Sequence, residues 1–423
     1  MKKIYKLSCV LSLAFAVCAC DFEPDLTQNT PTDKAYETLQ DVQNGTIGAY
    51  QALGYYPFLG NYAIAYGDFA GGLADGSSSS GHFYAQSNWA VSETDAELEG
   101  IWQYGFMVVD RTVRTINGAN KVLATSANLT DKDKAALYYN KSQCFGLRAL
   151  AYFTLSNFFC KPYNKGIEEK GLPIIKDKPV EAFKNSTRAS LGDTYQFICD
   201  DIDSALVNSE KAGQQSLQYF YMNRAAIYAL KARVNLYMGK YDVAEAAAKK
   251  AIELKGKGNG TSTDTDPTDE TYLNMWASVN VTDEDIFTIS KTENDNLSAN
   301  ALNTLYGSYN GSVSEYCSGF FAATDIRANL IGTVDSNKGG CRKYQGLETS
   351  QATSNIPVFR KSEMALIIAE CEARIGSLDE AKKYLGYTAK RDTQYAAEDG
   401  TCDLTKLPNT KEELLEFIWK ENT

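Results

Sequence analysis

Catalysis that depends on histidine has little support in this sequence. His82 is the only histidine in 423 residues, so Ser-His-Asp or Cys-His catalysis would have to use it. No GxSxG sequence accompanies it, and a single histidine excludes a histidine-rich metal site. His82 lies in the polar run SSSSGHFYAQ, where we expect a solvent-exposed loop residue, with a hydrogen bond to a ligand as the alternative. We therefore expect no catalytic residues, no cofactor and no metal site.

Carboxylates are abundant, and glycoside hydrolysis needs only a pair of them. No spacing in the sequence marks such a pair, so a surface glycosidase is the weakest alternative. The acidic run at Asp264, Asp266, Asp269 and Glu270 has the density of a calcium-binding loop. It lacks the glycine on which an EF-hand loop turns, so a solvated acidic loop is favoured.

Aromatic side chains are the stronger candidates, and the chemistry they offer is the recognition of a sugar. A sugar ring has an apolar face of C–H groups bordered by hydroxyls, which suits the flat ring and polar edge of Tyr and Trp. Neighbouring amides can bond the hydroxyls. The predicted ligand-binding residues are Trp89, Tyr84, Asn88, Trp276, Tyr306, Tyr309 and Asn310. For each aromatic residue the alternative is packing in the core, since Trp and Tyr are usually buried.

These candidates lie in two regions that are rich in glycine and aromatic residues. The first runs from 55 to 90, and the second lies in an irregular insertion at about 256–357, with a short strand predicted at 285–290. The first region has too much apolar content for a linker, so we interpret it as a long aromatic loop with a function. Helical sequence surrounds both regions, so helices must position them.

The clearest helical unit is residues 222–254, MNRAAIYALKARVNLYMGKYDVAEAAAKKAIEL. Small residues recur at helical spacing in both halves, and Gly239, which is free to adopt positive φ, separates them. The spacing Gly-x-Tyr-x-x-Ala-x-x-x-Ala-x-x-Ala resembles a tetratricopeptide repeat. A weaker copy follows at 360–385, where GSLDEA repeats GKYDVA. Two such hairpins predict stacking, and the alternative is an ordinary alanine-rich hairpin.

Start signals of the [ST]-x-x-[DE] kind mark further helices. They are Ser92 with Asp95, Thr130 with Asp133, Ser190 with Asp193, and Thr410 with Glu413. A first helix is predicted from about Asp33 to Leu53, and Trp102 and Trp419 are expected in the core. Because the last helix ends at Thr423 with apolar residues still lacking a partner, we expect the chain to be truncated at its C-terminal end.

The N-terminal residues predict export and lipid anchoring. Residues 1–19 join a basic start to a short apolar run, which is typical of a secretory signal and too short to span a membrane. Val17, Cys18 and Ala19 precede Cys20 as in a bacterial lipobox, so Cys20 is the predicted lipid anchor. The alternative is an ordinary signal peptide. We expect a tether at 20–32 and a single domain at 33–423, with the membrane contacted through the lipid alone.

Charge and cysteines add two expectations. The formal net charge is −11, and the loss of the leader lysines makes the mature chain more acidic, which argues against nucleic acid or anionic lipid headgroups as partners. Seven cysteines remain after the lipidated one, so at least one thiol stays free. Cys317 and Cys341 lie in loop-rich sequence and could pair, but no CxxC pattern indicates a zinc or redox site.

The order of these elements resembles the SusD/RagB family of outer-membrane nutrient-binding lipoproteins. The resemblance rests on QCFGLRALAYFTLSNFF, TRASLGDTYQFICDDIDSAL, YMNRAAIYALKARVNLYMGKYDVAEAAAKKAI and IPVFRKSEMALIIAECEARIGSLDEA, which follow a lipobox in the family's order. It implies a mainly α fold in which tetratricopeptide-like hairpins stack as a scaffold and long irregular insertions carry the ligand contacts. Trp89 is then the favoured residue, because a binding aromatic precedes the second helix in glycan-binding relatives. The chain departs from the family in being short and in ending at EFIWKENT.

The resemblance also implies a function without catalysis. Family members are surface lids that capture an oligosaccharide, or in some members a peptide, for a SusC-like TonB-dependent transporter of the outer membrane. We accordingly expect a lipid-anchored, surface-exposed protein of the outer membrane that binds an oligosaccharide. A peptide-binding member of the family and a tetratricopeptide-type protein-interaction scaffold are the alternatives, although a pure scaffold has no need of the long aromatic insertions.

Overall fold

The computed structural model describes residues 35–179, 185–213, 218–256, 272–273, 275–277, 280–344 and 351–422. The signal peptide, Cys20, the tether and the acidic run at 264–270 lie outside the described residues. The α-helices are α2 (Leu39–Leu53), α3 (Tyr62–Ala70), α4 (Tyr84–Ser87), α5 (Ala96–Thr125), α6 (Asp131–Phe159), α7 (Leu191–Lys211), α8 (Arg224–Tyr237), α9 (Tyr241–Lys255), α11 (Leu302–Tyr306), α12 (Glu315–Ser318), α13 (Lys361–Ile375), α14 (Leu378–Ala389) and α15 (Lys411–Asn422). The fold is mainly α, as the sequence predicts.

Short helical turns and short strands connect these helices. The turns are η1 (Tyr56–Gly60), η2 (Tyr163–Lys165), η3 (Met275–Ala277), η4 (Ser298–Asn300), η5 (Ile326–Leu330), η6 (Gln351–Thr353), η7 (Thr393–Tyr395) and η8 (Leu404–Lys406). The strands are β1 (Ala74–Asp75), β2 (Asp285–Ile289), β3 (Ser312–Val313), β4 (Ile331–Val334), β5 (Asn337–Cys341) and β6 (Ile356–Arg360). They form the antiparallel pairs β1–β3, β2–β6 and β4–β5, and β2 confirms the strand predicted at 285–290.

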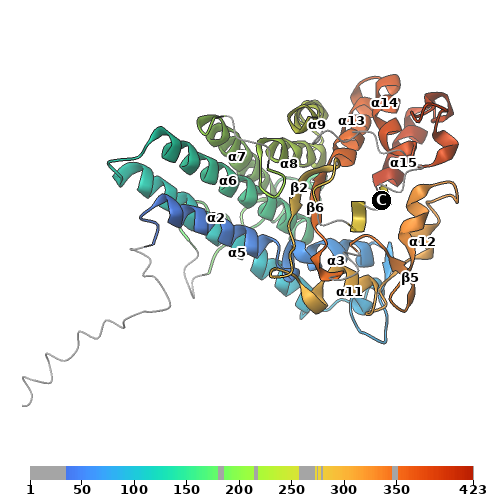
Figure 1. Cartoon of the computed structure of the whole chain (residues 1–423), viewed down its shortest axis with the longest axis horizontal. Helices are drawn as coiled ribbons and strands as arrows, with labels where there is room; N and C mark the ends of the chain where they lie inside the picture. Colours follow the sequence, from blue (N-terminus) through green and yellow to red (C-terminus); the bar gives the residue numbers. More distant parts are fainter. Residues whose placement is uncertain are drawn as a thin grey trace, which may run out of the picture.

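The long helices α2, α5, α6 and α7 lie side by side at one end of the molecule (Figure 1). A buried ion pair fastens α6 to α7. Arg148 donates from Nε and Nη2 to the two carboxylate oxygens of Asp201, both at 2.7 Å, and its guanidinium lies over the ring of Phe197. A charge this deeply buried is tolerated because its donors are matched by a bidentate carboxylate.

The two predicted hairpins are present, and they stack. Gly239 has φ +72° between α8 and α9, and α13 packs on α9 while α14 completes the second hairpin. Ala244 and Ala381 are fully buried, so the small residues lie at close helix contacts as expected. The second turn differs from the first, because Gly376 has φ −117° and is not left-handed.

Several helix starts agree with the capping signals. Thr130 forms a complete capping box with Asp133, and Ser190 and Thr410 accept from the backbone N–H groups three residues on. Ser92 does not cap a helix, because α5 begins at Ala96 with Asp95 as its N-cap. The first helix also begins later than predicted, at Leu39, after a capping box of Thr38 with Asp41.

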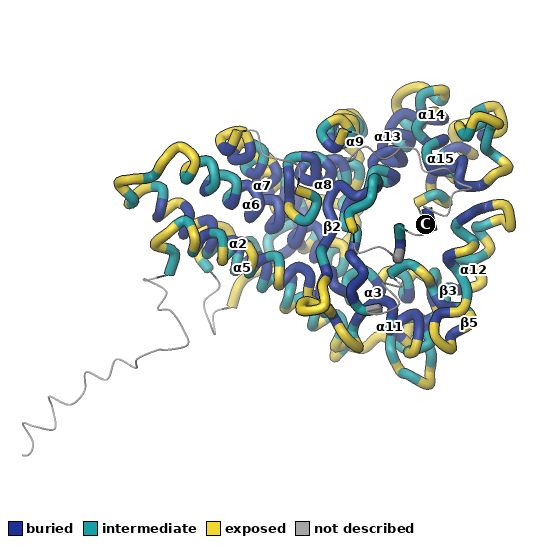
Figure 2. The backbone as a smooth tube through the Cα atoms, viewed as in Figure 1, coloured by how far each residue is buried: buried dark blue, intermediate teal, exposed yellow. Residues whose placement is uncertain are grey.

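The region at 55–90 is not the long loop that the sequence predicts. It contains η1, α3, β1 and α4, because its aromatic residues pack against one another and so stabilise short helical segments. Figure 2 shows buried residues, drawn in dark blue, in and around α3.

The last helix does not lack a partner. Leu414 and Ile418 are buried against α13 and α14, and Arg327 donates to Glu421 from the insertion. Trp419, expected in the core, is instead half exposed at 51%. The sequence of α15 alone could not predict these contacts, because they come from the α13–α14 hairpin and from the insertion.

The described cysteines are free thiols, so Cys317 and Cys341 are not paired. In the described ranges, no helix has the length and apolar character needed to cross a bilayer.

Candidate functional site

The candidate site is built on the end of the four-residue helix α4. After α4 the N–H of Trp89 donates to the carbonyl of Gln86 at 3.2 Å, and the N–H of Ala90 donates to Ala85 at 2.8 Å. This is the Schellman pattern of helix termination, in which the residue in the left-handed conformation is usually glycine. Here that residue is Trp89, with φ +55°. A non-glycine residue in this conformation costs about 1 to 2 kcal/mol.

The backbone turn places the indole of Trp89 in solvent. Trp89 is 79% exposed, which excludes the alternative that it packs in the core. Tyr84, the first residue of α4, is 44% exposed. Large apolar side chains of this exposure on a short, ordered turn are available to a ligand.

Polar groups hold α4 and its flanks in place. The side-chain amide of Asn88 donates to the carbonyl of Tyr84 at 2.8 Å, and the N–H of Gly76 donates to Ser87 Oγ at 3.1 Å. Asn88 is exposed, so its side chain both closes the helix end and lies at the surface beside Trp89.

The second aromatic region contacts the segment just before α4 through Tyr309. The ring of His82 stacks on Tyr309, with centroids 4.0 Å apart and planes inclined by 14°, and Ser80 Oγ donates to the Tyr309 carbonyl at 2.6 Å. Strands β1 and β3 pair just beside this contact, with Ala74 opposite Val313. His82 is therefore half buried against a partner ring, and the expectation of a solvent-exposed loop histidine is corrected. The sequence did not signal this stacking.

Asn310 follows in the left-handed conformation, with φ +59°, and is partly exposed. We call Trp89, Tyr84, Asn88, His82, Tyr309 and Asn310 the ring cluster. Five of the seven predicted ligand-binding residues belong to it.

The other two predicted residues are buried, which corrects their assignment. Tyr306 is 5% exposed, stacks on Phe69 and donates its hydroxyl to Asp68 at 2.9 Å. Trp276 is 6% exposed, and the cations of Lys343 and Arg360 each lie over its ring, 5.0 Å from the centroid. Both side chains stabilise the interior of the insertion. Residues that are distant in the sequence cover their rings, so the local sequence pattern could not predict their burial.

A buried stack of aromatic rings lies next to the ring cluster in the sequence and begins at Phe83. Phe83, with φ +51°, is 2% exposed and stacks on Phe69 at 4.9 Å, and Phe69 in turn stacks on Tyr306. Burial raises the pKa of Asp68, which accepts the hydroxyl of Tyr306. Tyr306 thus positions the site although it does not line it.

The charges next to the ring cluster are negative. Gln86 Nε2 donates to Asp95 at 2.8 Å and to Glu97 at 3.2 Å, which places two carboxylates against α4. Burial, with these carboxylates adding to it, raises the pKa of Tyr66 to about 12. The segments 76–95 and 302–315 that form the cluster contain neither lysine nor arginine.

The arrangement offers ring faces and amide hydrogen bonds to a ligand. No group of three or more His, Cys, Asp or Glu side chains that could hold a metal ion occurs in the described part of the chain. Stacking and hydrogen bonding at an exposed aromatic surface is the chemistry of carbohydrate or peptide recognition.

Comparisons with known proteins agree with this architecture. Residues 31–236 match the SusD-like family model described as starch-binding and associating with the outer membrane. Among curated proteins, none matches the chain.

Solved structures share the fold over most of the chain. A SusD superfamily protein from Bacteroides thetaiotaomicron is 22% identical, with a TM-score of 0.75, and the match covers 91% of this chain and 85% of that one. A SusD superfamily protein from Bacteroides vulgatus is 24% identical, with a TM-score of 0.72 and coverage of 92% and 89%. A SusD-like carbohydrate binding protein from Bacteroides vulgatus is 16% identical, with a TM-score of 0.73 and coverage of 92% and 80%. At these identities the likeness establishes a common fold.

Proposed function

We propose that this chain, which belongs to the SusD/RagB family, captures an oligosaccharide at the cell surface and delivers it to a transporter. The single observation that carries the ligand-binding part is Trp89, a 79% exposed indole at a backbone position that favours glycine. A strained and solvent-exposed tryptophan lowers stability, and such features persist mainly where a ligand uses them.

A glycan fits the ring cluster better than other ligands. Trp89 and Tyr84 present exposed apolar faces, and the amides of Asn88, which is exposed, and Asn310, which is partly exposed, can bond hydroxyl groups. The absence of lysine and arginine from both segments also removes the cations that would pair with an acidic peptide.

We infer the delivery system from the role of the SusD/RagB family. A lipid on Cys20 would hold the protein on the outer membrane, exposed at the cell surface, and a SusC-like TonB-dependent transporter would receive the ligand. The proposed role is binding without turnover, and the only histidine, His82, stacks on Tyr309.

Affinity electrophoresis through gels containing a panel of polysaccharides tests the proposal, with free peptides measured in parallel by calorimetry. We expect at least one neutral polysaccharide to retard the purified protein, with no reducing ends released during incubation. If only peptides bind, the ligand is a peptide and not an oligosaccharide. If reducing ends are released, the protein is a glycosidase and the proposed binding function without turnover is wrong.

A further inference from the structure

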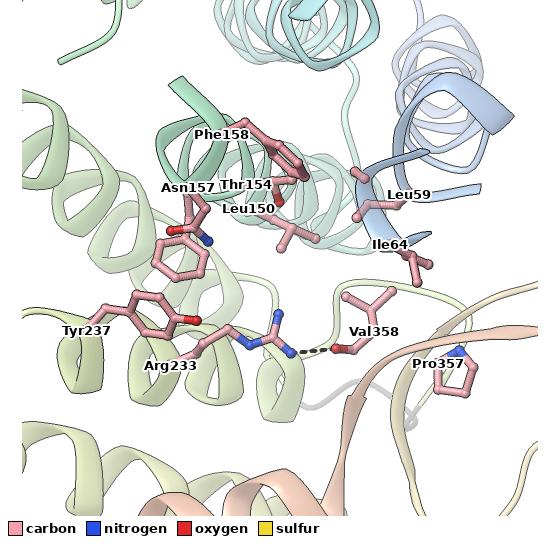
Figure 3. Close-up of a pocket in the computed structure, with 12 residues that line it drawn as sticks. Leu59, Ile64, Leu150, Thr154, Asn157, Phe158, Arg233, Tyr237, Pro357 and Val358 are labelled. Carbon is pink, nitrogen blue, oxygen red and sulfur yellow. Dashed lines mark hydrogen bonds between the residues drawn. The ribbon is translucent and has the colours of Figure 1, made fainter. Parts of the chain in front are cut away.

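A pocket separate from the ring cluster lies between α6, α8, β6 and the η1–α3 segment (Figure 3). Its volume is about 340 Å³, which falls within the range of small-molecule sites. Its apolar lining consists of Leu59, Ala63, Ile64, Leu150, Phe153, Phe158, Pro357 and Val358. Its polar lining consists of Thr154, Asn157, Arg233 and Tyr237, and none of these residues belongs to the ring cluster.

Arg233 is held rigidly at one wall of the pocket. Its Nε and Nη2 donate to the carboxylate of Glu363 at 2.5 and 2.7 Å, and Nη2 also donates to the carbonyl of Val358 at 2.6 Å. The guanidinium lies 4.2 Å from the centroid of Phe359. Figure 3 shows the other terminal nitrogen turned into the pocket. Arg233 therefore presents a fixed donor whose charge Glu363 neutralises.

The other three polar residues of the wall differ from Arg233. Within the described ranges, the side chains of Thr154, Asn157 and Tyr237 make no hydrogen bond. Thr154 is 9% exposed and lines the pocket, where its hydroxyl can donate to or accept from a ligand hydroxyl. Tyr237 is held by an edge-to-face contact with Phe153, at 5.1 Å between centroids.

The chemistry of this lining selects one class of ligand. The ion pair of Arg233 with Glu363 leaves no net charge, so an anion or a cation gains little there. Hydroxyl groups both donate and accept, which matches the mixture of guanidinium, amide and hydroxyl groups on the polar wall. The apolar wall can cover the C–H face of a ring. We propose that this pocket binds one neutral hexopyranose unit, as a second sugar site independent of the ring cluster.

The test uses the Trp89→Ala protein, which removes the main aromatic surface of the ring cluster. Glucose, galactose, mannose and N-acetylglucosamine are titrated by ligand-observed NMR, with glucuronate as the charged control. We expect saturable binding of at least one neutral sugar and weaker binding of glucuronate. Thr154→Val and Tyr237→Phe, which remove single hydroxyls at nearly constant volume, should each weaken that binding by about threefold to tenfold, the value of one hydrogen bond.

Circular dichroism melting of each variant establishes that it is folded, and Tyr237→Phe retains the ring and hence its packing on Phe153. The proposal is overturned if no neutral sugar binds the Trp89→Ala protein saturably. It is equally overturned if folded Thr154→Val and Tyr237→Phe proteins bind as tightly as their parent, or if glucuronate binds best. These outcomes are distinct from failure of the ring cluster, which Trp89→Ala alone reports.

Discussion

The imidazole of His82 stacks on the phenol of Tyr309 with ring centroids 4.0 Å apart, and this contact joins two regions that lie far apart in the chain. The hydrogen bond from Ser80 to the Tyr309 carbonyl and the pairing of β1 with β3 fix the same junction. The exposed rings of Trp89 and Tyr84 are therefore attached to a supported surface rather than to a free loop, which lowers the entropy lost when a ligand binds.

The ring cluster should bind neutral glycans more tightly than anionic glycans. Asp95 and Glu97 lie against α4, and no lysine or arginine occurs in the two segments that form the cluster, so an anionic glycan meets repulsion. We expect the sulfated derivative of the preferred neutral polysaccharide to bind at least about threefold more weakly at low salt. Calorimetry at two salt concentrations measures this.

A charge reversal at the exposed Glu93 provides the matched variant for this prediction. Glu93→Lys should strengthen binding of the sulfated derivative and leave the neutral glycan nearly unaffected. Equal affinity of the parent protein for both derivatives at low salt would show that charge does not select the ligand.

The stacked hairpins should not tolerate larger side chains at their small buried positions. Ala244→Leu and Ala381→Leu should each lower the free energy of unfolding by about 1 to 3 kcal/mol, because the added volume forces the helices apart. Urea denaturation measures the loss. Ala246→Leu is the control, since Ala246 lies on the exposed face of α9. Three equal midpoints would contradict the close helix contact.

Glu284 should make stability depend on acid pH. Burial alone would raise the pKa of this carboxyl, but Arg391, Arg360 and the hydroxyls of Ser362 and Tyr387 outweigh burial and lower it overall. A carboxyl with a lowered folded-state pKa contributes stability above its unfolded pKa of about 4.3, and this contribution is lost as pH falls through the folded value.

We therefore expect Glu284→Gln to lower the free energy of unfolding by about 3 kcal/mol at pH 7, because two arginines lose their buried counterion. Denaturation at a series of pH values should show the difference between variant and parent shrinking below about pH 4. A difference that stays constant down to pH 2 would mean that the charge of Glu284 is not the source of the stability.

Cys20 should carry the lipid, since it follows the basic and apolar leader of a lipobox. Metabolic labelling with a fatty acid should mark the parent protein and not Cys20→Ser. Cys18→Ser serves as a control that keeps Cys20 intact. Equal labelling of the parent and the Cys20→Ser protein would exclude anchoring at this residue.

The stacked hairpins could be predicted from the sequence, because alanine spacing and a turn glycine are local signals. The start of the helix after Trp89 differs from the prediction, because Ser92 forms the [ST]-x-x-[DE] pattern with Asp95, whereas Asp95 is itself a favoured N-cap residue and caps the helix in the folded chain. Local pattern therefore predicts that an element exists better than it predicts where the element begins.

The site was only partly predictable for a different reason. Composition identified the two aromatic regions, but the exposure of each aromatic side chain depends on contacts between distant segments. Tyr306 is covered by Phe69 and Asp68, and Trp276 by Lys343 and Arg360, whereas nothing comparable covers Trp89. The sequence pattern does not distinguish these three residues. Their exposure differs only because of how the folded chain packs around them.

The central claim is that the exposed indole of Trp89 binds an oligosaccharide, and isothermal titration of Trp89→Ala with the preferred glycan tests it most directly. Trp419→Ala is the matched control, because Trp419 is 51% exposed on α15, outside the ring cluster. We predict that Trp89→Ala weakens binding by at least about 0.5 to 1.5 kcal/mol with a nearly unchanged melting temperature, while Trp419→Ala binds as the parent does. Unchanged affinity of the Trp89→Ala protein, or equal losses in both variants, would contradict the account.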